Sequence, residues 1–174
     1  SFADVPDVNM GALKVVSHLL NYVYLGNEVR VQGGAYGVSC RFNRDKEGFF
    51  TSYRDPNLSS TLDVYRKAAD YLEGFEADER EITKTIIGTI SGMDTPLTPA
   101  MKGRRSMVAY FTETPVSVLQ NERDQVLSCD KEDIRKAPAG TLSAIAESIS
   151  ELLAYRDMPL DKLGILTKNR IPVV

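Results

Sequence analysis

The 174-residue sequence predicts an α+β fold, in which an antiparallel sheet packs against helices on one side and a helix-rich second half follows. Three observations predict this class. Apolar residues recur at three- and four-residue intervals before Arg30, alternate with polar residues between Tyr36 and Tyr53, and then return to helical spacing behind repeated helix-start signals. With 43% hydrophobic residues, the chain has enough apolar side chains for the core of one domain over residues 1–174.

The first predicted helix follows an irregular start at residues 1–9 and ends near Arg30. Its apolar positions fall on one stripe, which is typical of a helix with one face on a core. They are Leu13, Val16, Leu20, Val23 and Tyr24.

An antiparallel hairpin is predicted between residues 36 and 53. Apolar and polar side chains alternate over residues 38–42, residues 45–48 have turn composition, and a second extended run covers residues 49–53. The proline and its polar neighbours at residues 55–57 end the second strand.

The rest of the chain predicts a succession of helices with recognisable starts. These starts are Ser60 with Asp63 for a helix that ends at Gly74, Asp78 with Glu81, Thr98-Pro99, Thr114-Pro115, and Asp130 for a short helix to Lys136. Residues 92–99 are expected to link two helices, residues 142–152 to form a last long helix, and residues 163–166 to form a further strand.

Composition argues against several classes of partner. Twenty-one basic and 24 acidic residues give a net charge of -3, and the basic residues are scattered, so we expect no nucleic-acid partner. No apolar run has the length of a membrane span, and the N-terminus lacks the layout of a signal peptide, so we expect no membrane partner. Cys40 and Cys129 lack neighbours at ligand spacing and are expected to be buried free thiols. Such thiols favour a reducing compartment, which we take as the cytoplasm with an organelle matrix as the alternative.

Two segments carry the candidate site, namely residues 30–37 (RVQGGAYG) and residues 52–57 (SYRDPN). Arg30 and Tyr36 stand on either side of the adjacent Gly33 and Gly34, where a predicted helix gives way to a strand. A guanidinium offers forked donors, a phenol adds another, and glycines without Cβ let a second backbone approach. The pattern predicts a device that holds a carbonyl group.

Each of these residues also has a structural interpretation. Arg30 at the end of a helix would complement the helix dipole, and Tyr36 would be a core aromatic whose hydroxyl bonds to backbone. Gly33 and Gly34 would form a C-cap, which is compatible with the functional interpretation. Arg54 would either line a substrate chamber or pair locally within an Asp-Pro-Asn turn.

The chain shows no catalytic or metal-binding motif of its own. His18 is the only histidine, and the residues around it do not form H-x-x-E-H, so we expect a structural histidine and no metal site. The sequence also lacks a G-x-S-x-G elbow, a Cys-His pair and a phosphate-binding loop.

Residues 12–18 (ALKVVSH), taken with residues 30–37 and 52–57, resemble the last domain of presequence proteases. These enzymes belong to the pitrilysin and insulin-degrading class of zinc peptidases with an inverted motif. The resemblance is specific over residues 11–72. It implies the metallopeptidase-half fold of the LuxS and processing-peptidase type, within a protein whose two similar halves close around a peptide chamber.

The same resemblance implies the roles of the site residues. Zinc would lie in the N-terminal half of the full-length protein, so no cofactor is expected in this chain. Arg30 and Tyr36 would reach across to the substrate carbonyl or to the transition state, with Gly33, Gly34 and Arg54 in substrate-binding positions. The expected partners are the zinc-bearing N-terminal half and short unfolded peptides, and the isolated chain is expected to be inactive.

The resemblance is incomplete at both ends of the chain. The family places a strand before the first helix, where this chain has only residues 1–9, and residues 155–174 match the family pattern poorly. We therefore expect the last domain of a larger peptidase without its first strand. Because an unpaired sheet edge favours pairing, we also expect a homodimer in isolation. The alternative function is a stand-alone structural or peptide-binding module related to processing-peptidase or respiratory-complex core subunits.

Overall fold

The computed structural model describes residues 2, 5, 8–136 and 141–142 and confirms a helix-rich α+β fold. The described elements are α1 (Met10–Leu19), η1 (Leu20–Tyr24), η2 (Gly26–Gln32), β1 (Gly37–Phe42), β2 (Gly48–Tyr53), α2 (Leu58–Arg66), α3 (Ala68–Glu73), α4 (Glu79–Met93), α5 (Pro99–Phe111), α6 (Val116–Leu127) and α7 (Lys131–Lys136). Apart from Leu142, the predicted helix at 142–152 and strand at 163–166 lie outside the described residues. No helix in the described part of the chain is long and apolar enough to cross a membrane.

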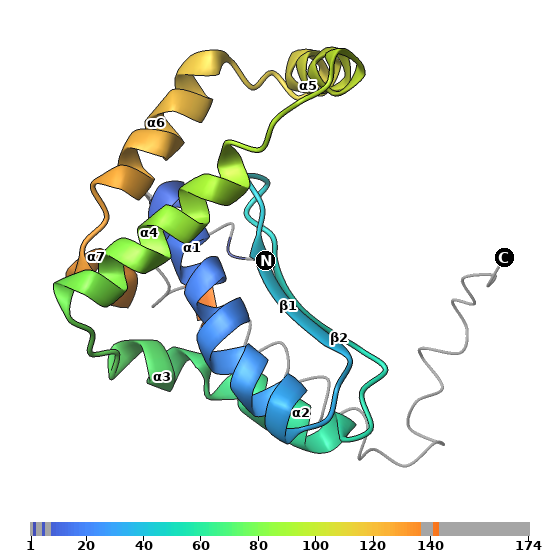
Figure 1. Ribbon diagram of the computed structural model, residues 1–174, viewed down its shortest axis with the longest axis vertical. Coiled ribbons are helices and arrows are strands. Elements are labelled where there is room, and N and C mark those ends of the chain that lie inside the picture. Colours follow the sequence, from blue (N-terminus) through green and yellow to red (C-terminus); the bar gives the residue numbers. More distant parts are fainter. Residues whose placement is uncertain (1, 3–4, 6–7, 137–140, 143–174) are drawn as a thin grey trace, which may run out of the picture.

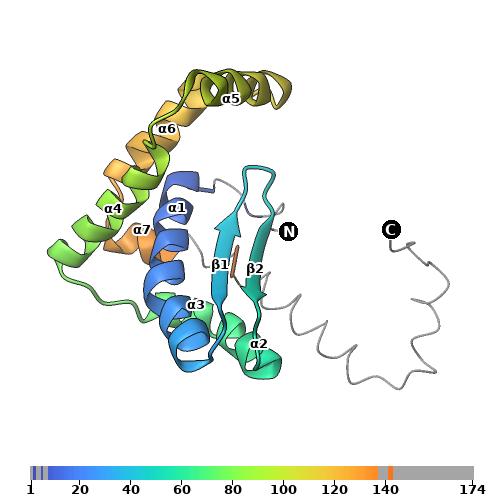
Figure 2. The ribbon, with the colours of Figure 1, turned by 45° about the vertical axis from the view of Figure 1, so that its right-hand side comes forward.

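Helix α1 lies at the centre of the molecule, between the hairpin and a layer formed by α4 and α6 (Figures 1 and 2). Helices α2 and α3 close the end of the domain next to the hairpin, and α7 packs against α1 and α3. Helix α5 stands away from the rest of the domain, and none of its residues is buried. The predicted packing of helices against one side of the sheet is therefore confirmed around α1.

The predicted hairpin is confirmed as an antiparallel pair, with Gly37 opposite Tyr53 at one end and Phe42 opposite Gly48 at the other. Cys40 of β1 is fully buried. In β2 every second residue is exposed, and the residues between them are half-buried against the helices. The inward-facing Phe50 ring stacks on Tyr65 of α2, with 4.7 Å between the ring centroids. Within the described residues this sheet has two strands.

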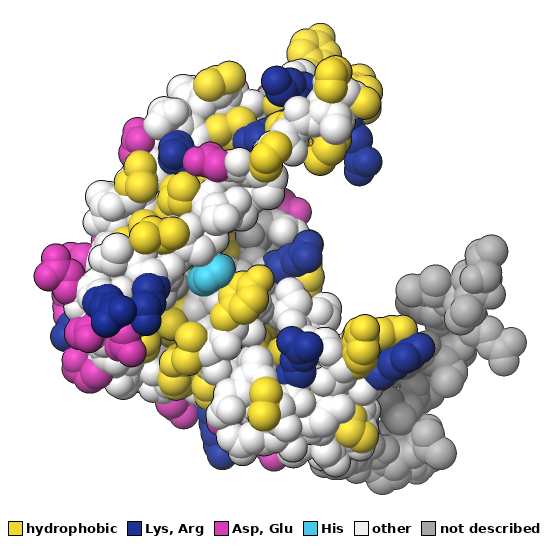
Figure 3. Space-filling model, in the orientation of Figure 1, with side chains coloured by type: hydrophobic (Ala, Val, Ile, Leu, Met, Phe, Trp, Pro, Cys, Tyr) yellow, Lys and Arg dark blue, Asp and Glu magenta, His cyan; other side chains and the backbone are white. Residues whose placement is uncertain are grey.

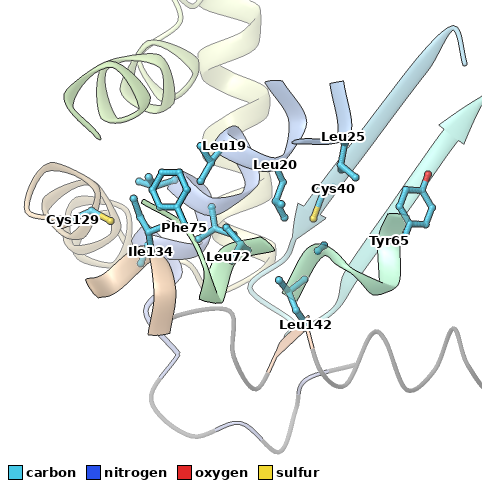
Figure 4. Packing of buried hydrophobic residues seen from close by; sticks show 14 of the residues in the cluster. Leu19, Leu20, Leu25, Cys40, Tyr65, Leu72, Phe75, Cys129, Ile134 and Leu142 are labelled. Carbon is cyan, nitrogen blue, oxygen red and sulfur yellow. The ribbon is translucent and has the colours of Figure 1, made fainter. Parts of the chain in front are cut away.

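The hydrophobic core lies where the first helix meets α3, α7 and β1 (Figure 4). Its labelled members include Leu19, Leu20, Leu72, Phe75 and Ile134. Cys40 and Cys129 are both buried and free, as predicted. Burial, with a smaller effect of nearby Asp133 and Asp130, raises the pKa of Cys129 to about 12, and burial also raises the pKa of Cys40. Both thiols are therefore protonated at neutral pH.

Three of the predicted helix starts are confirmed by their capping bonds. The Asp78 carboxylate accepts from the Glu81 amide at 2.8 Å, and the Thr98 hydroxyl accepts from the Met101 amide at 3.3 Å. The Asp130 carboxylate accepts from the amide three residues later, at 2.8 Å. These side chains satisfy donors that the first helical turn leaves free.

The caps predicted for two other helices are misplaced, by three residues for α2 and by one residue for α6. Helix α2 begins at Leu58, and Ser60 is inside its first turn, where its hydroxyl donates to the Asn57 carbonyl. The helix predicted there is also interrupted at Lys67 between α2 and α3. Helix α6 has Pro115 itself in the capping position, without a side-chain bond. The two side chains predicted as caps, Ser60 and Thr114, instead donate their hydroxyl hydrogens to nearby backbone carbonyls.

Glu122 of α6 is a buried carboxylate that joins three parts of the fold. Its side chain is 4% exposed and accepts from Arg44 of the hairpin turn at 2.5 and 2.7 Å, while the Lys14 ammonium of α1 lies 3.3 Å away. Burial by itself would raise the pKa of Glu122, but the Arg44 bonds and the Lys14 charge lower it below the ordinary value of 4.5.

We expect Glu122→Gln to lower the free energy of unfolding by about 1.5 kcal/mol at pH 7, because a charge-assisted pair becomes a neutral contact. Since the folded-state pKa is depressed, the contribution of Glu122 is present above pH 4.5 and is lost as the pH falls toward the folded value. The difference between variant and wild type should therefore shrink below pH 4.5 in urea unfolding. The exposed Glu47→Gln serves as control, and a pH-independent difference would contradict the prediction.

Candidate functional site

The segment that ends in Arg30 is a π-helix rather than an α-helix. The first helix ends at Gln32, two residues beyond Arg30 and close to the predicted end, and the Gly33 amide donates to the Glu28 carbonyl, five residues back, at 3.0 Å. Side chains on this turn therefore take positions that an α-helical period does not predict.

Gly33 and Gly34 end this helix for two different reasons. Gly34 has a φ of 77°, in the left-handed region that disfavours other residues, and its amide donates to the Arg30 carbonyl at 3.1 Å. The Ala35 amide donates to the Val29 carbonyl at 3.1 Å, and this bond encloses the one from Gly34. The pair resembles a Schellman motif, but each bond spans one more residue. A Cβ on Gly33 would lie 2.5 Å from the Val29 carbonyl oxygen. The C-cap interpretation of the glycine pair is confirmed.

Tyr36 lies on the surface, with 69% of its area exposed. Its ring meets that of Tyr53 edge to face at 5.9 Å, and the Arg54 guanidinium carbon lies 5.9 Å from the Tyr36 ring and 5.4 Å from the Tyr53 ring. The interpretation of Tyr36 as a core aromatic is therefore wrong. Arg54 is not paired with a carboxylate among the described residues; its local partners are the two rings.

The two sequence segments of the candidate site meet in space. The Asn57 side-chain amide donates to the Gly33 carbonyl at 2.8 Å, and a Cβ on Gly34 would stand 3.5 Å from the Pro56 ring. The Asp55 carboxylate stabilises the turn by accepting a hydrogen bond from the backbone amide of Asn57 at 2.9 Å. The Asp-Pro-Asn turn thus fixes the position of the glycine pair, and with it the direction in which Tyr36 leaves the helix.

Arg30 lies in an open hollow of about 630 Å³ between η2 and β1. Gly37, which follows Tyr36, lines the same hollow, together with Arg41 and Tyr22. Arg30 is exposed and forms no ion pair within the described ranges. The fold therefore places Arg30 and Tyr36 at the two ends of one turn, both open to solvent, but no described contact joins the two side chains.

Two residues of this hollow escaped the sequence analysis. Tyr22 interrupts the polar face of the first helix and is 75% exposed, and Arg41 occupies a solvent-facing position of β1. An exposed aromatic on a helix is the only signal that the sequence offers for Tyr22. Arg41 looks like an ordinary polar position of an alternating strand, and only the position of the strand beside η2 distinguishes it.

His18 belongs to the packing of the first helix against α4. Its ring lies 4.5 Å from that of Tyr22, and a Cβ on Gly88 would come within 2.3 Å of its Nε2 atom. Burial lowers the pKa of His18, so the imidazole is neutral at pH 7. In the part of the chain that the structure describes, no three His, Cys, Asp or Glu side chains are close enough to hold a metal ion. These residues therefore do not fit a zinc site.

Comparison with known proteins places the chain in a family. The model of the PreP C-terminal domain matches residues 5–151. Protein HypA of Clostridium perfringens is 46% identical over 125 residues, which cover 72% of this chain and 13% of the relative. Presequence protease 1, chloroplastic/mitochondrial, of Arabidopsis thaliana is 36% identical, over 72% of this chain and 12% of the relative. Mitochondrial presequence protease of Xenopus tropicalis is 28% identical, over 76% of this chain and 13% of the relative. The chain thus spans only a small part of the length of these relatives, and it belongs to the presequence protease family, in which it corresponds to the C-terminal domain.

Proposed function

We propose that this domain is the non-catalytic C-terminal part of a zinc metalloendopeptidase that degrades short unfolded peptides. In this proposal the domain closes the peptide chamber against a zinc-bearing N-terminal half of the same protein, and the isolated chain is inactive. Membership of the presequence protease family supports a peptidase. The absence of a fitting set of metal ligands within the described residues is compatible with zinc being held elsewhere in the full-length protein.

The observation that carries the proposal is the free state of two donors beside a rigid turn. The Arg30 guanidinium and the Tyr36 hydroxyl have no described hydrogen-bond partner, although the turn between them is held by the Asn57 bond and the left-handed Gly34. The turn sets where both side chains leave the backbone, and donors without a partner among the described residues can bind a carbonyl oxygen of another molecule. Directed at a peptide carbonyl, they stabilise the negative charge that develops on its oxygen during hydrolysis.

Gly33, Gly34 and Arg54 have supporting roles in this proposal. The space beside each glycine is filled by the chain itself, so their part at the substrate-binding surface is to form the turn that directs Tyr36 toward a substrate. The Arg54 guanidinium carbon lies over the Tyr36 ring, 5.9 Å from its centroid. Arg54 has a φ of 49°, an uncommon conformation for a residue with a side chain. Because that conformation places the guanidinium beside two rings, we assign Arg54 to orienting Tyr36 at the substrate-binding surface.

For the compartment, we propose the cytoplasm, with an organelle matrix as the alternative. The plant and frog relatives carry organellar names, whereas the name of the Clostridium perfringens relative gives no compartment. Two buried free thiols suit either reducing environment.

The test is Tyr36→Phe in the full-length parent protein, assayed on an unstructured peptide. Loss of one neutral donor should lower kcat/KM by about tenfold or more while the fold is retained. Tyr110→Phe is the matched control, because Tyr110 is 80% exposed on α5 and far from the turn in sequence. Equal kcat/KM for wild type and a folded Tyr36→Phe variant would leave a structural domain that does not act on substrate.

A further inference from the structure

The hollow that contains Arg30 continues into a second one along β1. The second hollow, of about 420 Å³, lies between α1, β1 and α4, and shares Asn21, Tyr22 and Arg41 with the first. The two spaces form one groove, which we call the β1 groove; it runs from Arg30 past Arg41 to His18. A ligand that occupies both hollows must extend along β1, as an extended peptide does.

None of the described residues that line the β1 groove is acidic, although the chain contains 24 acidic residues. Figure 3 shows dark blue side chains in the middle and at the lower right of this face, whereas most magenta ones gather at its left-hand edge. Lys14, at one end of the groove, lies 3.3 Å from Glu122, but that carboxylate also binds Arg44, so this cluster keeps one positive charge in excess. Arg30 and Arg41 form no ion pair with any described residue. These two guanidinium groups therefore carry the positive charge of the groove that has no described carboxylate beside it.

The groove follows the outer edge of β1, which is bonded to the first helix at Cys40 and has no described helix bond at Val38. The amide and carbonyl of Cys40 point away from β2 and bond to the Asn21 side chain at 2.5 and 3.1 Å, and Ser17 donates to the same carbonyl at 2.6 Å. Backbone groups of a strand alternate between its two edges, so the amide and carbonyl of Val38 point to the same side as those of Cys40. Val38 lines the groove, next to Ser39. An extended peptide can therefore pair with β1 at Val38.

We propose that the β1 groove binds an extended peptide through a carboxylate of that peptide, with Arg41 as the specificity-determining residue beside Arg30. A guanidinium binds a carboxylate through two parallel hydrogen bonds, and a second unpaired guanidinium in the same groove strengthens the local positive potential. The carboxylate belongs either to an acidic side chain or to the C-terminus of the peptide. This inference rests on the proposed function, because it takes a peptide as the occupant.

The test measures binding of four matched peptides to the full-length parent protein. The peptides combine Glu or Gln at one position with a C-terminal acid or amide, and a metal chelator prevents hydrolysis by a zinc peptidase. Wild type should bind one carboxylate form about tenfold more tightly than its neutral counterpart. The Glu-against-Gln arm identifies a side-chain carboxylate, and the acid-against-amide arm identifies the C-terminus.

Arg41→Gln should reduce that preference to about twofold or less, and Arg41→Glu should reverse it, so that the neutral form of the peptide binds more tightly than the carboxylate form. The exposed Arg80→Gln is the control for general loss of positive charge and should keep the wild-type preference. Equal binding of all four peptides to wild type, or an unchanged preference in a folded Arg41→Gln variant, overturns the proposal. Because binding is measured without turnover, this outcome is separate from the kinetic test of Tyr36, which decides the proposed function.

Discussion

Arg30→Gln in the full-length parent protein is expected to lower kcat/KM on an unstructured peptide by about a hundredfold to a thousandfold. The loss should exceed that of Tyr36→Phe, because a charged donor stabilises a developing oxyanion more strongly than a neutral hydroxyl does. Arg30 has no described carboxylate partner that would compete for the guanidinium, so its donors are available to the substrate. If Arg30 acts in the transition state, kcat should carry most of the loss; if it holds the ground state, KM should carry it.

Two further variants make this prediction specific to the geometry of Arg30. Arg30→Lys keeps the charge but loses the fork and should recover only part of the activity. Arg80→Gln removes an exposed arginine in the first turn of α4 and should leave kcat/KM unchanged. A folded Arg30→Gln variant with wild-type kinetics would contradict the proposed function, whatever the result for Arg41.

Elements whose signals are local could be predicted from the sequence. The hairpin follows from alternation and a polar turn, and the starts at Asp78, Thr98 and Asp130 follow from side chains that bond within their own first turn. The capping bonds join residues three positions apart, and the hairpin joins two neighbouring segments of the chain. Packing elsewhere in the molecule does not change them, which is why the pattern was sufficient.

Features that depend on the meeting of distant segments could not be predicted in the same way. The π-helical turns before Gly33 shift the apolar stripe, so the prediction that Val23 faces the core is wrong: Val23 is 52% exposed and Leu25 is buried instead. The sequence carries no separate signal for these turns. Arg54 was expected to line a chamber or to pair locally, and the pairing with the Tyr36 ring requires the register of the hairpin. Arg41 reaches the candidate site only because β1 lies beside η2.

The sequence identifies the candidate site only as a motif. Arg30 and Tyr36 were found from their spacing around two glycines, and the structure adds that both side chains are exposed at the two ends of a turn fixed by Asn57. The sequence could not decide whether Tyr36 was buried, because an aromatic residue just before a strand fits either a core or a surface position.

The contact between α1 and α6 depends on a glycine, and we expect Gly11→Ala to lower the free energy of unfolding by about 2 kcal/mol. A Cβ on Gly11 would lie 2.3 Å from the Cβ of Gln125 and 2.7 Å from the Glu122 carbonyl oxygen. Neither atom is the far end of a flexible side chain, so the two helices must move apart. Such movement also weakens the bond from the Gly11 amide to the Gln125 side chain, at 3.0 Å.

Gly92→Ala in α4 is the matched control for this prediction, because no atom lies within 4 Å of the Cβ that it would add. Alanine is a better helix former than glycine by about 0.5–1 kcal/mol, so Gly92→Ala should stabilise the chain. Urea unfolding of the two variants should therefore give changes of opposite sign. If Gly11→Ala were stabilising to the same extent as Gly92→Ala, only helix propensity would matter at both sites, and α1 and α6 would not pack at the distance that the structure gives. A destabilised Gly11→Ala variant with a normal Gly92→Ala variant would show that the close approach of α1 and α6 holds the helical layer against the central helix.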